Sequence, residues 1–406
     1  MEEVFVGRQP ILNKNQVIFG YELLFRTVSK ISANVTDNLR ATASVMANTL
    51  NDIGFKNIVG EKKGFINVDE EILSNGMIDL LPKENTVLEI LENVEISDSF
   101  ISLCTRLKDN GYIFALDDFV YSDSYLPLFK IADYVKLDIL MYGKKELAHI
   151  VQVLKRHSLR LLAEKVETDE DYKQCCDLGF EFFQGYFFSK PIIVSGKSLT
   201  PASVTLLKLF NSLSREEEID VIERLFKRSP QLDVKLLKFM NSASFYVTQK
   251  INSIRQAIMM LGYRTLQKWI SLMLFANNGE DMRSNPLLEK AAMRGLIMES
   301  LAKDITNNRN TGDAASITGI LSLTDALLGM PLEKILNDLN LSKEIFDALT
   351  NREGLLGKLL WIVEMLEEER LSEIPGPLSE WKLGLRDLLE IQTNAIMEFE
   401  SIDNLN

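Results

Sequence analysis

Short β-type runs alternate with helical patterns from Phe5 to about Phe188, and this alternation constrains the fold more than any other feature of the sequence. The expected strands are Val17–Phe25, Gly64–Val68, Thr86–Leu91, Tyr112–Leu116, Tyr134–Leu137, Arg160–Ala163 and Phe182–Gln184. Amphipathic stretches that suit helices lie between them: Asn38–Ile53, Asp98–Lys108, Lys145–Arg156 and Asp169–Leu178. Repeated strand–helix units predict a parallel α/β architecture, and the number of units suits a (β/α) barrel.

The pattern of apolar and polar residues changes after a connector at Lys190–Pro201, which contains two prolines, a glycine and serines. Beyond it the strand-like alternation stops and helical periodicity takes over. The expected helices include Ala202–Leu213, Ile219–Phe226, Val234–Met240 and Ile254–Leu261. We therefore predict two domains in this chain of 406 residues, an α/β barrel over 1–195 and an all-helical domain over 199–406.

Charge and composition exclude several classes of function. The formal net charge of −13 argues against nucleic-acid binding, which needs a basic surface. Only two histidines are present, His149 and His157, and this small number argues against a histidine-rich zinc site or a histidine-based nucleophilic triad. The three cysteines have no zinc spacing and suit a reduced compartment. Without a basic apolar leader or a run long enough to span a bilayer, a cytoplasmic protein that does not engage membranes is expected.

Polar and charged residues recur in or just after the apolar strand runs of the first half. The set comprises Glu22, Asn67, Glu89, Asp117, Asp118, Lys136, Asp138, Glu164, Glu167 and Gln184. A charge inside an apolar strand costs several kcal/mol unless it is paired or metal-bound. One such charge could be a structural ion pair, but strand after strand carries one, and in a barrel these strand ends converge on one mouth.

The chemistry of this set favours hard metal ions. Its candidate ligands are carboxylate and amide oxygens, which suit Mg²⁺ or Mn²⁺. The adjacent pair Asp117 and Asp118 could serve two ions, and two neighbouring ions can activate a water and stabilise both oxygens of a phosphodiester displacement. Lys136 could hold the attacking water or neutralise developing charge. Arg26 offers a planar fork that suits a phosphate.

Several motifs in the first half resemble, in order, those of the EAL-domain cyclic di-GMP phosphodiesterases. They are Gln9-Pro10-Ile11, Glu22-Leu23-Leu24-Phe25-Arg26, Asp117-Asp118-Phe119, Lys136-Leu137-Asp138, Ala163-Glu164-Lys165-Val166-Glu167 and Gln184-Gly185-Tyr186. In the second half, Phe226 to Ala276 resembles the HDOD domains, notably at Leu236–Ala243 and Ile254–Gly262. The whole chain therefore resembles the EAL–HDOD arrangement.

The resemblance implies a role for each residue of the set. Glu22, Asn67, Glu89 and Asp117 would bind one of two Mg²⁺ or Mn²⁺ ions, and Asp118 with Glu167 the second. Lys136 would contact the nucleophilic water, with Glu164 and Gln184 completing the site and Glu92 anchoring the Glu89 motif. Gln9, Arg26 and Asp138 would touch the phosphates or guanines of cyclic di-GMP. The product would be linear pGpG. The resemblance also leaves room for a homodimer through the barrel and for a protein partner of the helical domain.

Departures from the EAL pattern keep other hypotheses open. The glycine-rich loop that usually follows the paired aspartates is replaced by Val120–Tyr125, and Lys165 stands where a glycine is common. The first departure favours a barrel that binds cyclic di-GMP with little turnover and signals through the helical domain. A third hypothesis is a scaffold with neither ligand nor catalysis. Because no histidine follows His157, we expect the helical domain to be catalytically silent.

Overall fold

The structure, a computed structural model, describes residues 4–27, 54–74, 78, 81–92, 94–119, 125–185, 201–227, 229–240, 251, 253–275, 285–328 and 330–403. The chain divides into two compact units, Met1–Lys190 and Pro191–Asn406. The predicted boundary between residues 195 and 199 lies outside the described residues, and so does the predicted helix Asn38–Ile53. Both stay predictions.

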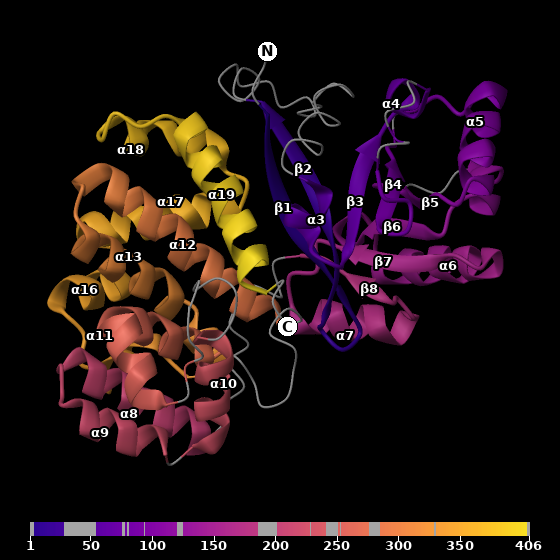
Figure 1. The fold of residues 1–406 in the computed structure, drawn as a ribbon. Helices are drawn as coiled ribbons and strands as arrows, with labels where there is room; N and C mark the ends of the chain where they lie inside the picture. The colour runs from indigo at the N-terminus through magenta and orange to yellow at the C-terminus, as the bar shows by residue number, and fades with distance from the viewer. Residues whose placement is uncertain are drawn as a thin grey trace. The chain divides into compact units, whose positions relative to one another are not determined.

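The first unit contains a closed barrel whose strands follow the order of the sequence, β1 to β8 (Figure 1). The strands are β1 (Val4–Asn13), β2 (Ile18–Thr27), β3 (Lys63–Val68), β4 (Thr86–Ile90), β5 (Ile113–Leu116), β6 (Tyr134–Asp138), β7 (Arg160–Glu164) and β8 (Phe182–Phe183). Neighbours from β2 to β8 are parallel, whereas β1 is antiparallel to both β2 and β8. The predicted α/β barrel is therefore confirmed, and the antiparallel strand β1 is an addition that the sequence did not predict.

Strand β1 was not predicted because its sequence does not look like a strand. Arg8, Gln9 and Pro10 interrupt the apolar pattern, and a proline cannot donate to a sheet ladder. In the structure β1 pairs with β2 along its length, but it pairs with β8 through Leu12 and Asn13, past the proline. Around Pro10 the strand therefore behaves as an edge, where a proline is tolerated.

Helices lie on the outside of this barrel (Figure 1). They are α3 (Phe55–Val59), α4 (Glu70–Ser74), α5 (Asp98–Asp109), α6 (Lys144–Leu154) and α7 (Asp169–Leu178), with short 3₁₀ turns at Leu128–Lys130, Ile139–Met141 and Lys155–His157. Local sequence explains the start of α7, where Thr168 and Asp171 form a reciprocal capping box. The side chain of Ser97 likewise caps α5 by accepting from the backbone N–H of Phe100.

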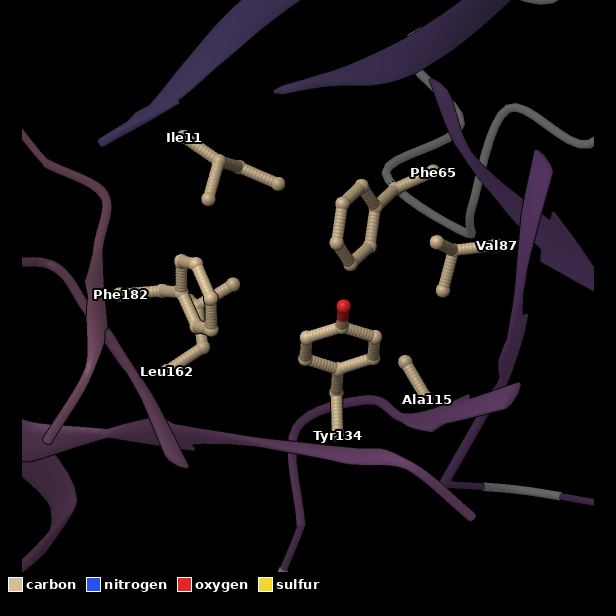
Figure 2. Packing of buried hydrophobic residues seen from close by; sticks show 7 residues of the cluster. All are labelled: Ile11, Phe65, Val87, Ala115, Tyr134, Leu162 and Phe182. Atoms are coloured by element: carbon tan, nitrogen blue, oxygen red, sulfur yellow. The ribbon is translucent and has the colours of Figure 1, made fainter. Parts of the chain in front are cut away.

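A hydrophobic layer fills the inside of the barrel. Its side chains, Ile11, Phe65, Val87, Ala115, Tyr134, Leu162 and Phe182, come from nearly every strand and point toward one another (Figure 2). The ring of Tyr134 makes edge contacts with Phe65 and Phe182, at centroid separations of 5.6 and 5.5 Å. Burying such side chains contributes about 1.5–3 kcal/mol each, so this layer fixes the strand register on which the polar residues depend.

In the described part of the second unit, every regular element is a helix, as the sequence predicted. The α-helices are α8 (Pro201–Ser214), α9 (Ile219–Phe226), α10 (Pro230–Met240), α11 (Ile254–Met273), α12 (Pro286–Thr306), α13 (Arg309–Leu321), α14 (Thr324–Leu328), α15 (Leu332–Asn337), α16 (Lys343–Asn351), α17 (Gly354–Glu367), α18 (Pro375–Ser379) and α19 (Leu385–Asp403). A 3₁₀ turn at Leu371–Glu373 precedes α18. Gly262, at φ 73° and ψ 163°, kinks α11.

Helices α12 and α13 approach closely. A Cβ atom on Gly319 of α13 would lie 2.7 Å from the carbonyl carbon of Arg294 on α12, so only glycine fits there. Among the described residues, no helix is both long enough and apolar enough to cross a bilayer.

Candidate active site

A polar layer lies one step along the strands from the hydrophobic layer of the barrel. Because side chains two positions apart point to the same face of a strand, each member of the hydrophobic layer fixes a partner above it. Phe65 is followed in this way by Asn67, Val87 by Glu89, Ala115 by Asp117, Tyr134 by Lys136, Leu162 by Glu164, and Phe182 by Gln184. On the antiparallel pair, Gln9 of β1 lies opposite Glu22 of β2. The polar layer therefore sits at the carboxyl ends of the parallel strands.

The ammonium of Lys136 lies at the centre of this layer. Its Nζ atom is 2.6 Å from Asp117 Oδ1, 3.0 Å from Glu89 Oε1, 3.0 Å from Glu164 Oε1 and 3.3 Å from Glu22 Oε2. The Lys136 side chain is only 1% exposed. Four carboxylates from β2, β4, β7 and the end of β5 thus share a single buried cation.

The pKa values reflect this imbalance. Burial lowers the pKa of the Lys136 ammonium, but Asp117, Glu164 and the other carboxylates outweigh it and hold the pKa well above its usual value. Burial raises the pKa of Glu89 well above its usual value, and burial raises the pKa of Glu164 to about 8, with Lys136 opposing both shifts. The lysine therefore keeps its proton, while one ammonium cannot neutralise every carboxyl group around it.

Gln184, which directly follows β8, joins the polar layer where β8 and β1 close the barrel. Its Nε2 atom donates to Glu22 Oε2 at 2.7 Å and to Gln9 Oε1 at 2.8 Å. This amide fixes one oxygen of Glu22 and brings Gln9 of β1 to the same mouth. Two of the three side chains are buried, and Gln9 is half-buried.

Several oxygens of the layer lack hydrogen-bond partners. Asn67 Oδ1, Glu89 Oε2 and Glu164 Oε2 are buried and accept no hydrogen bond from the described residues. Unpaired buried acceptors are costly and call for a partner. Carboxylate and amide oxygens of this kind suit Mg²⁺ or Mn²⁺, so the donor set fits a hard divalent ion.

Within the described residues, no group of three or more histidine, cysteine, aspartate or glutamate side chains is arranged to hold a metal. The Lys136 ammonium explains this, because it stands between the carboxylates that would share an ion. A single ammonium nevertheless leaves the negative charge of these acids only partly neutralised.

The rim of the mouth carries further charged groups. Asp118 is exposed and has a left-handed backbone at φ 40°; partial burial and Asp117 raise its pKa, while Lys165 opposes the shift. Glu92 and Glu167 are also exposed, and the backbone oxygen of Glu92 accepts a hydrogen bond of 3.2 Å from the Tyr125 hydroxyl. Also at the rim, Lys165 Nζ contacts Asp138 Oδ2 at 2.5 Å.

Comparison with known proteins agrees with both halves of the chain. The EAL domain family matches residues 2–191, and the HDOD domain family matches residues 199–329. Cyclic di-GMP phosphodiesterase CdgJ of Vibrio cholerae serotype O1 is 33% identical over 410 residues, which span 100% of this chain and 94% of that protein. The chain belongs to the EAL–HDOD family. YuxH of Bacillus subtilis, an uncharacterized protein, is also 33% identical, over 93% of this chain and 94% of its own length.

Solved EAL structures resemble the first unit at lower similarity. BlrP1 of Klebsiella pneumoniae, in a manganese and cy-diGMP complex, is 20% identical with a TM-score of 0.37, covering 45% of this chain and 54% of that one. The PaMucR phosphodiesterase in complex with c-di-GMP is 18% identical with a TM-score of 0.38, covering 46% and 96%.

The EAL domain brings together most of the predicted site residues. Gln9, Glu22, Glu89, Asp117, Lys136, Glu164 and Gln184 are joined by the contacts given above, and Asn67 occupies the same layer. Asp118, Glu167 and Glu92 are exposed instead of buried with them. The side chain of Arg26 and residues 120–124 lie outside the description. The roles assigned to all these residues stay predictions.

Sequence reasoning missed the ion pair between Lys165 and Asp138. The sequence places Lys165, a cation in the position of a common glycine, near the expected metal site, and the resemblance predicts that Asp138 touches the ligand. The two residues are 27 positions apart, so no local pattern could connect them. The register does so, because Asp138 of β6 pairs with Glu164 of β7, the residue immediately before Lys165.

Gly185 holds the end of β8 against the turn after β7. Its φ is 145°, and a Cβ atom there would lie 2.3 Å from the backbone nitrogen of Val166 and 2.5 Å from the Val166 oxygen. We expect Gly185→Ala to destabilise the EAL domain by about 1–3 kcal/mol, because backbone, not a flexible side chain, must move. Hydrogen–deuterium exchange of peptides from β7 and β8 would measure the loss.

Gly111→Ala is the matched control for this substitution. Gly111 also has a positive φ, 94°, but nothing lies within 4 Å of its Cβ position. Gly111→Ala should therefore show the cost of backbone conformation alone. Equal losses from the two substitutions would contradict the proposed effect of close contact at Gly185.

Proposed function

We propose that the EAL domain hydrolyses cyclic di-GMP to linear pGpG with the help of two Mg²⁺ or Mn²⁺ ions. The observation that carries this proposal is the buried polar layer, in which four carboxylates surround one ammonium and further oxygens lack partners. The name of the relative CdgJ, a cyclic di-GMP phosphodiesterase, points to the same substrate.

Bound divalent ions would supply an activated water and charge stabilisation at the phosphate. Asn67, Glu22, Glu89 and Asp117 are the residues we assign to the first ion, and Asp118 with Glu167 to the second. The second pair is exposed and lies apart from the buried carboxylates assigned to the first ion. Gln9, Arg26 and Asp138 are assigned to the phosphates and guanines of the ligand.

The chain's own residues organise the reaction. Gln184 holds one oxygen of Glu22 at 2.7 Å and so sets the direction of that carboxylate. Lys136 is assigned to the attacking water, with Glu164 as its buried neighbour. A water that reaches Lys136 must replace one of its carboxylate contacts, and the longest of these is the 3.3 Å contact to Glu22. Hydrolysis then joins the water oxygen to phosphorus while the ribose O3′ leaves with a proton.

The decisive experiment is incubation of the purified full chain with cyclic di-GMP, followed by chromatography of the nucleotides. We expect pGpG with Mn²⁺ or Mg²⁺ and none with EDTA. Persistence of cyclic di-GMP under all metal conditions would refute the proposed hydrolysis.

Glu22→Ala should weaken Mn²⁺ binding and turnover together. Removing a group that merely supports a metal ligand costs about 10–100-fold in affinity or activity, so loss of a ligand should cost at least about 10-fold. Calorimetric titration with Mn²⁺ measures the metal effect separately from catalysis. Glu181→Gln is a matched control, because Glu181 is 41% exposed and pairs with Arg160. Unchanged Mn²⁺ affinity in Glu22→Ala would remove Glu22 from the metal site.

A second candidate function is binding of cyclic di-GMP with little turnover. The exposure of Asp118 and Glu167 favours it, because these residues are not gathered with the buried carboxylates. Under this hypothesis the HDOD domain signals occupancy of the EAL domain to a protein partner. Tight calorimetric binding of cyclic di-GMP by a chain that yields no pGpG would support this function over hydrolysis.

The HDOD domain itself is assigned an output or regulatory role. The chain has no histidine beyond His157, which leaves that domain without the histidine ligands of a phosphohydrolase metal site. We therefore expect the helical half to be catalytically silent. If the EAL domain is inactivated by Glu22→Ala in the full chain, the helical half should supply no phosphohydrolase activity of its own.

A further inference from the structure

Lys165 occupies a backbone conformation that favours glycine. Its φ is 55°, in the left-handed region, where side chains other than Asn and Asp are uncommon. The turn is held on both sides of it: the Ala163 carbonyl before it accepts from Gln184 N–H at 2.8 Å, and Val166 N–H after it donates to the Gln184 carbonyl at 3.1 Å. The conformation would be easier for glycine, so the lysine is explained by its side chain and not by the turn.

The side chain of Lys165 reaches the rim of the mouth. Its Nζ atom contacts Asp138 Oδ2 at 2.5 Å, while Asp138 Oδ1 accepts the Leu140 N–H at 2.9 Å. Asp138 is 8% exposed, but Lys165 is 57% exposed. The carboxylate is therefore fixed from both sides, and it holds an ammonium that a ligand can reach. An ammonium has three donors, so contact with Asp138 leaves capacity for a second acceptor.

The charge around this ammonium explains why a cation is needed there. The polar layer contains four carboxylates for one buried ammonium, and Asp118 adds a carboxylate at the rim. An anionic ligand that enters such a mouth is repelled unless positive charge lies near its path. Lys165 places positive charge at that point, within electrostatic range of Asp118.

We propose that Lys165 is a ligand-binding residue whose ammonium, held by Asp138, donates a hydrogen bond to a phosphate oxygen of the cyclic dinucleotide. This inference rests on the proposed function for the identity of the ligand. It adds a phosphate contact to the EAL domain at a position where glycine would supply none, and it gives Asp138 a second task as the anchor of that contact.

Calorimetric titration of cyclic di-GMP into the full chain tests the proposal, with EDTA and again with Ca²⁺. Lys165→Met should weaken binding about 10-fold, the size expected of one charge-assisted hydrogen bond at a partly exposed site. Lys165→Arg should keep most of the affinity. Lys173→Met is the matched control, because Lys173 also pairs with an aspartate, Asp169, on the same domain and is 70% exposed.

Salt dependence separates a phosphate contact from a merely structural role. Loss of a direct ionic contact should make the affinity of Lys165→Met fall less steeply with NaCl than that of the parent, because screening acts on that contact. If Lys165 only positions Asp138, affinity falls while the salt dependence stays parental, and the proposal is overturned. Lys165→Gly should bind as weakly as Lys165→Met without losing thermal stability, since the left-handed backbone suits glycine.

The outcomes also distinguish this inference from the proposed function. If the Lys165→Met variant binds cyclic di-GMP as tightly as the parent does, the phosphate contact alone is overturned. A parent with no affinity for cyclic di-GMP in EDTA or Ca²⁺, and no turnover in Mn²⁺, overturns the proposed function and the phosphate contact with it.

Discussion

Lys136→Met is expected to lower the turnover of cyclic di-GMP by about 10²–10³-fold, the usual cost of removing an electrostatic interaction made in the transition state. Binding of cyclic di-GMP should be comparatively intact, because the Lys136 side chain is 1% exposed and so lies beneath the surface that a ligand meets. Chromatographic turnover assays with Mn²⁺ and parallel calorimetric titrations would measure the two effects. A variant that hydrolyses at the parental rate would remove Lys136 from the reaction.

The same substitution should destabilise the EAL domain. It leaves Glu89, Asp117 and their neighbours without their shared cation, and breaking a buried ion pair from one side costs about 3–5 kcal/mol. Asp117→Asn added to Lys136→Met removes the stranded carboxylate that lies nearest to the ammonium, at 2.6 Å, so it should restore part of the stability but none of the turnover. Hydrogen–deuterium exchange of β4 and β6 would follow stability independently of activity. Lys173→Met again serves as the exposed control.

The sequence could predict the barrel and most of the polar layer because both depend on local spacing. From β3 to β8, each polar residue stands two positions after a residue of the hydrophobic layer, as Glu89 does after Val87. Period-two alternation is visible in a single strand, and parallel strands bring their carboxyl ends together. Strand β1 was not predicted, because Pro10 and its polar neighbours interrupt the apolar pattern by which a strand is recognised.

The contacts between distant segments could not be predicted from local pattern. Lys136 is predicted to contact the nucleophilic water, but no local pattern predicts the carboxylates that surround it in the structure, of which Glu22 is 114 positions away. Whether two strand ends meet is decided by register and by barrel closure, which no window of sequence contains. The pair of Lys165 and Asp138 has the same origin, and so does a buried ion pair in the helical half.

Glu367→Gln is expected to loosen the packing of α12 and α17 in the second, helical unit. Arg294 on α12 binds Glu367 on α17 through two hydrogen bonds of 2.7 Å, and its third nitrogen donates to Ser322 Oγ at 2.8 Å. Lys290 Nζ lies 2.9 Å from the same carboxylate. The Arg294 side chain is only 6% exposed. Removing the carboxylate charge leaves the buried Arg294 and Lys290 with Glu364, 3.5 Å from Arg294 Nη1, as their remaining acidic neighbour; breaking a buried ion pair from one side costs up to about 3–5 kcal/mol.

The pKa shifts identify Arg294 as the main partner. Burial raises the pKa of Glu367, but Arg294 and then Lys290 outweigh it, so the pKa of this carboxyl group lies below its usual value. Lys290 is the weaker partner. Burial lowers the pKa of its ammonium by more than the Glu367 carboxylate raises it, so the pKa of Lys290 lies below its usual value. The bidentate geometry supports the arginine, since a planar guanidinium matches both carboxylate oxygens at once.

The sign of the pH dependence follows from the lowered pKa of Glu367. The unfolded chain binds a proton at this site more readily than the folded chain does, so stability rises with pH through this window. The contribution of Glu367 is therefore complete above the ordinary pKa of a glutamate, 4.5, and is lost as the pH falls through the lower folded value. Glu367→Gln should abolish this part of the acid sensitivity, because glutamine has no proton to gain there.

Hydrogen–deuterium exchange of peptides from α12 and α17, measured in the full chain at neutral and acidic pH, tests both statements about Glu367. Glu380→Gln is the matched control, because Glu380 is 55% exposed and pairs with Lys358, which is 53% exposed. An exposed pair contributes less than about 1 kcal/mol, so this variant should exchange like the parent. If Glu367→Gln exchanged no faster than Glu380→Gln at neutral pH, burial of the Arg294 guanidinium would not depend on its carboxylate partner. Stability at this point would then come from the apolar packing around α12 alone.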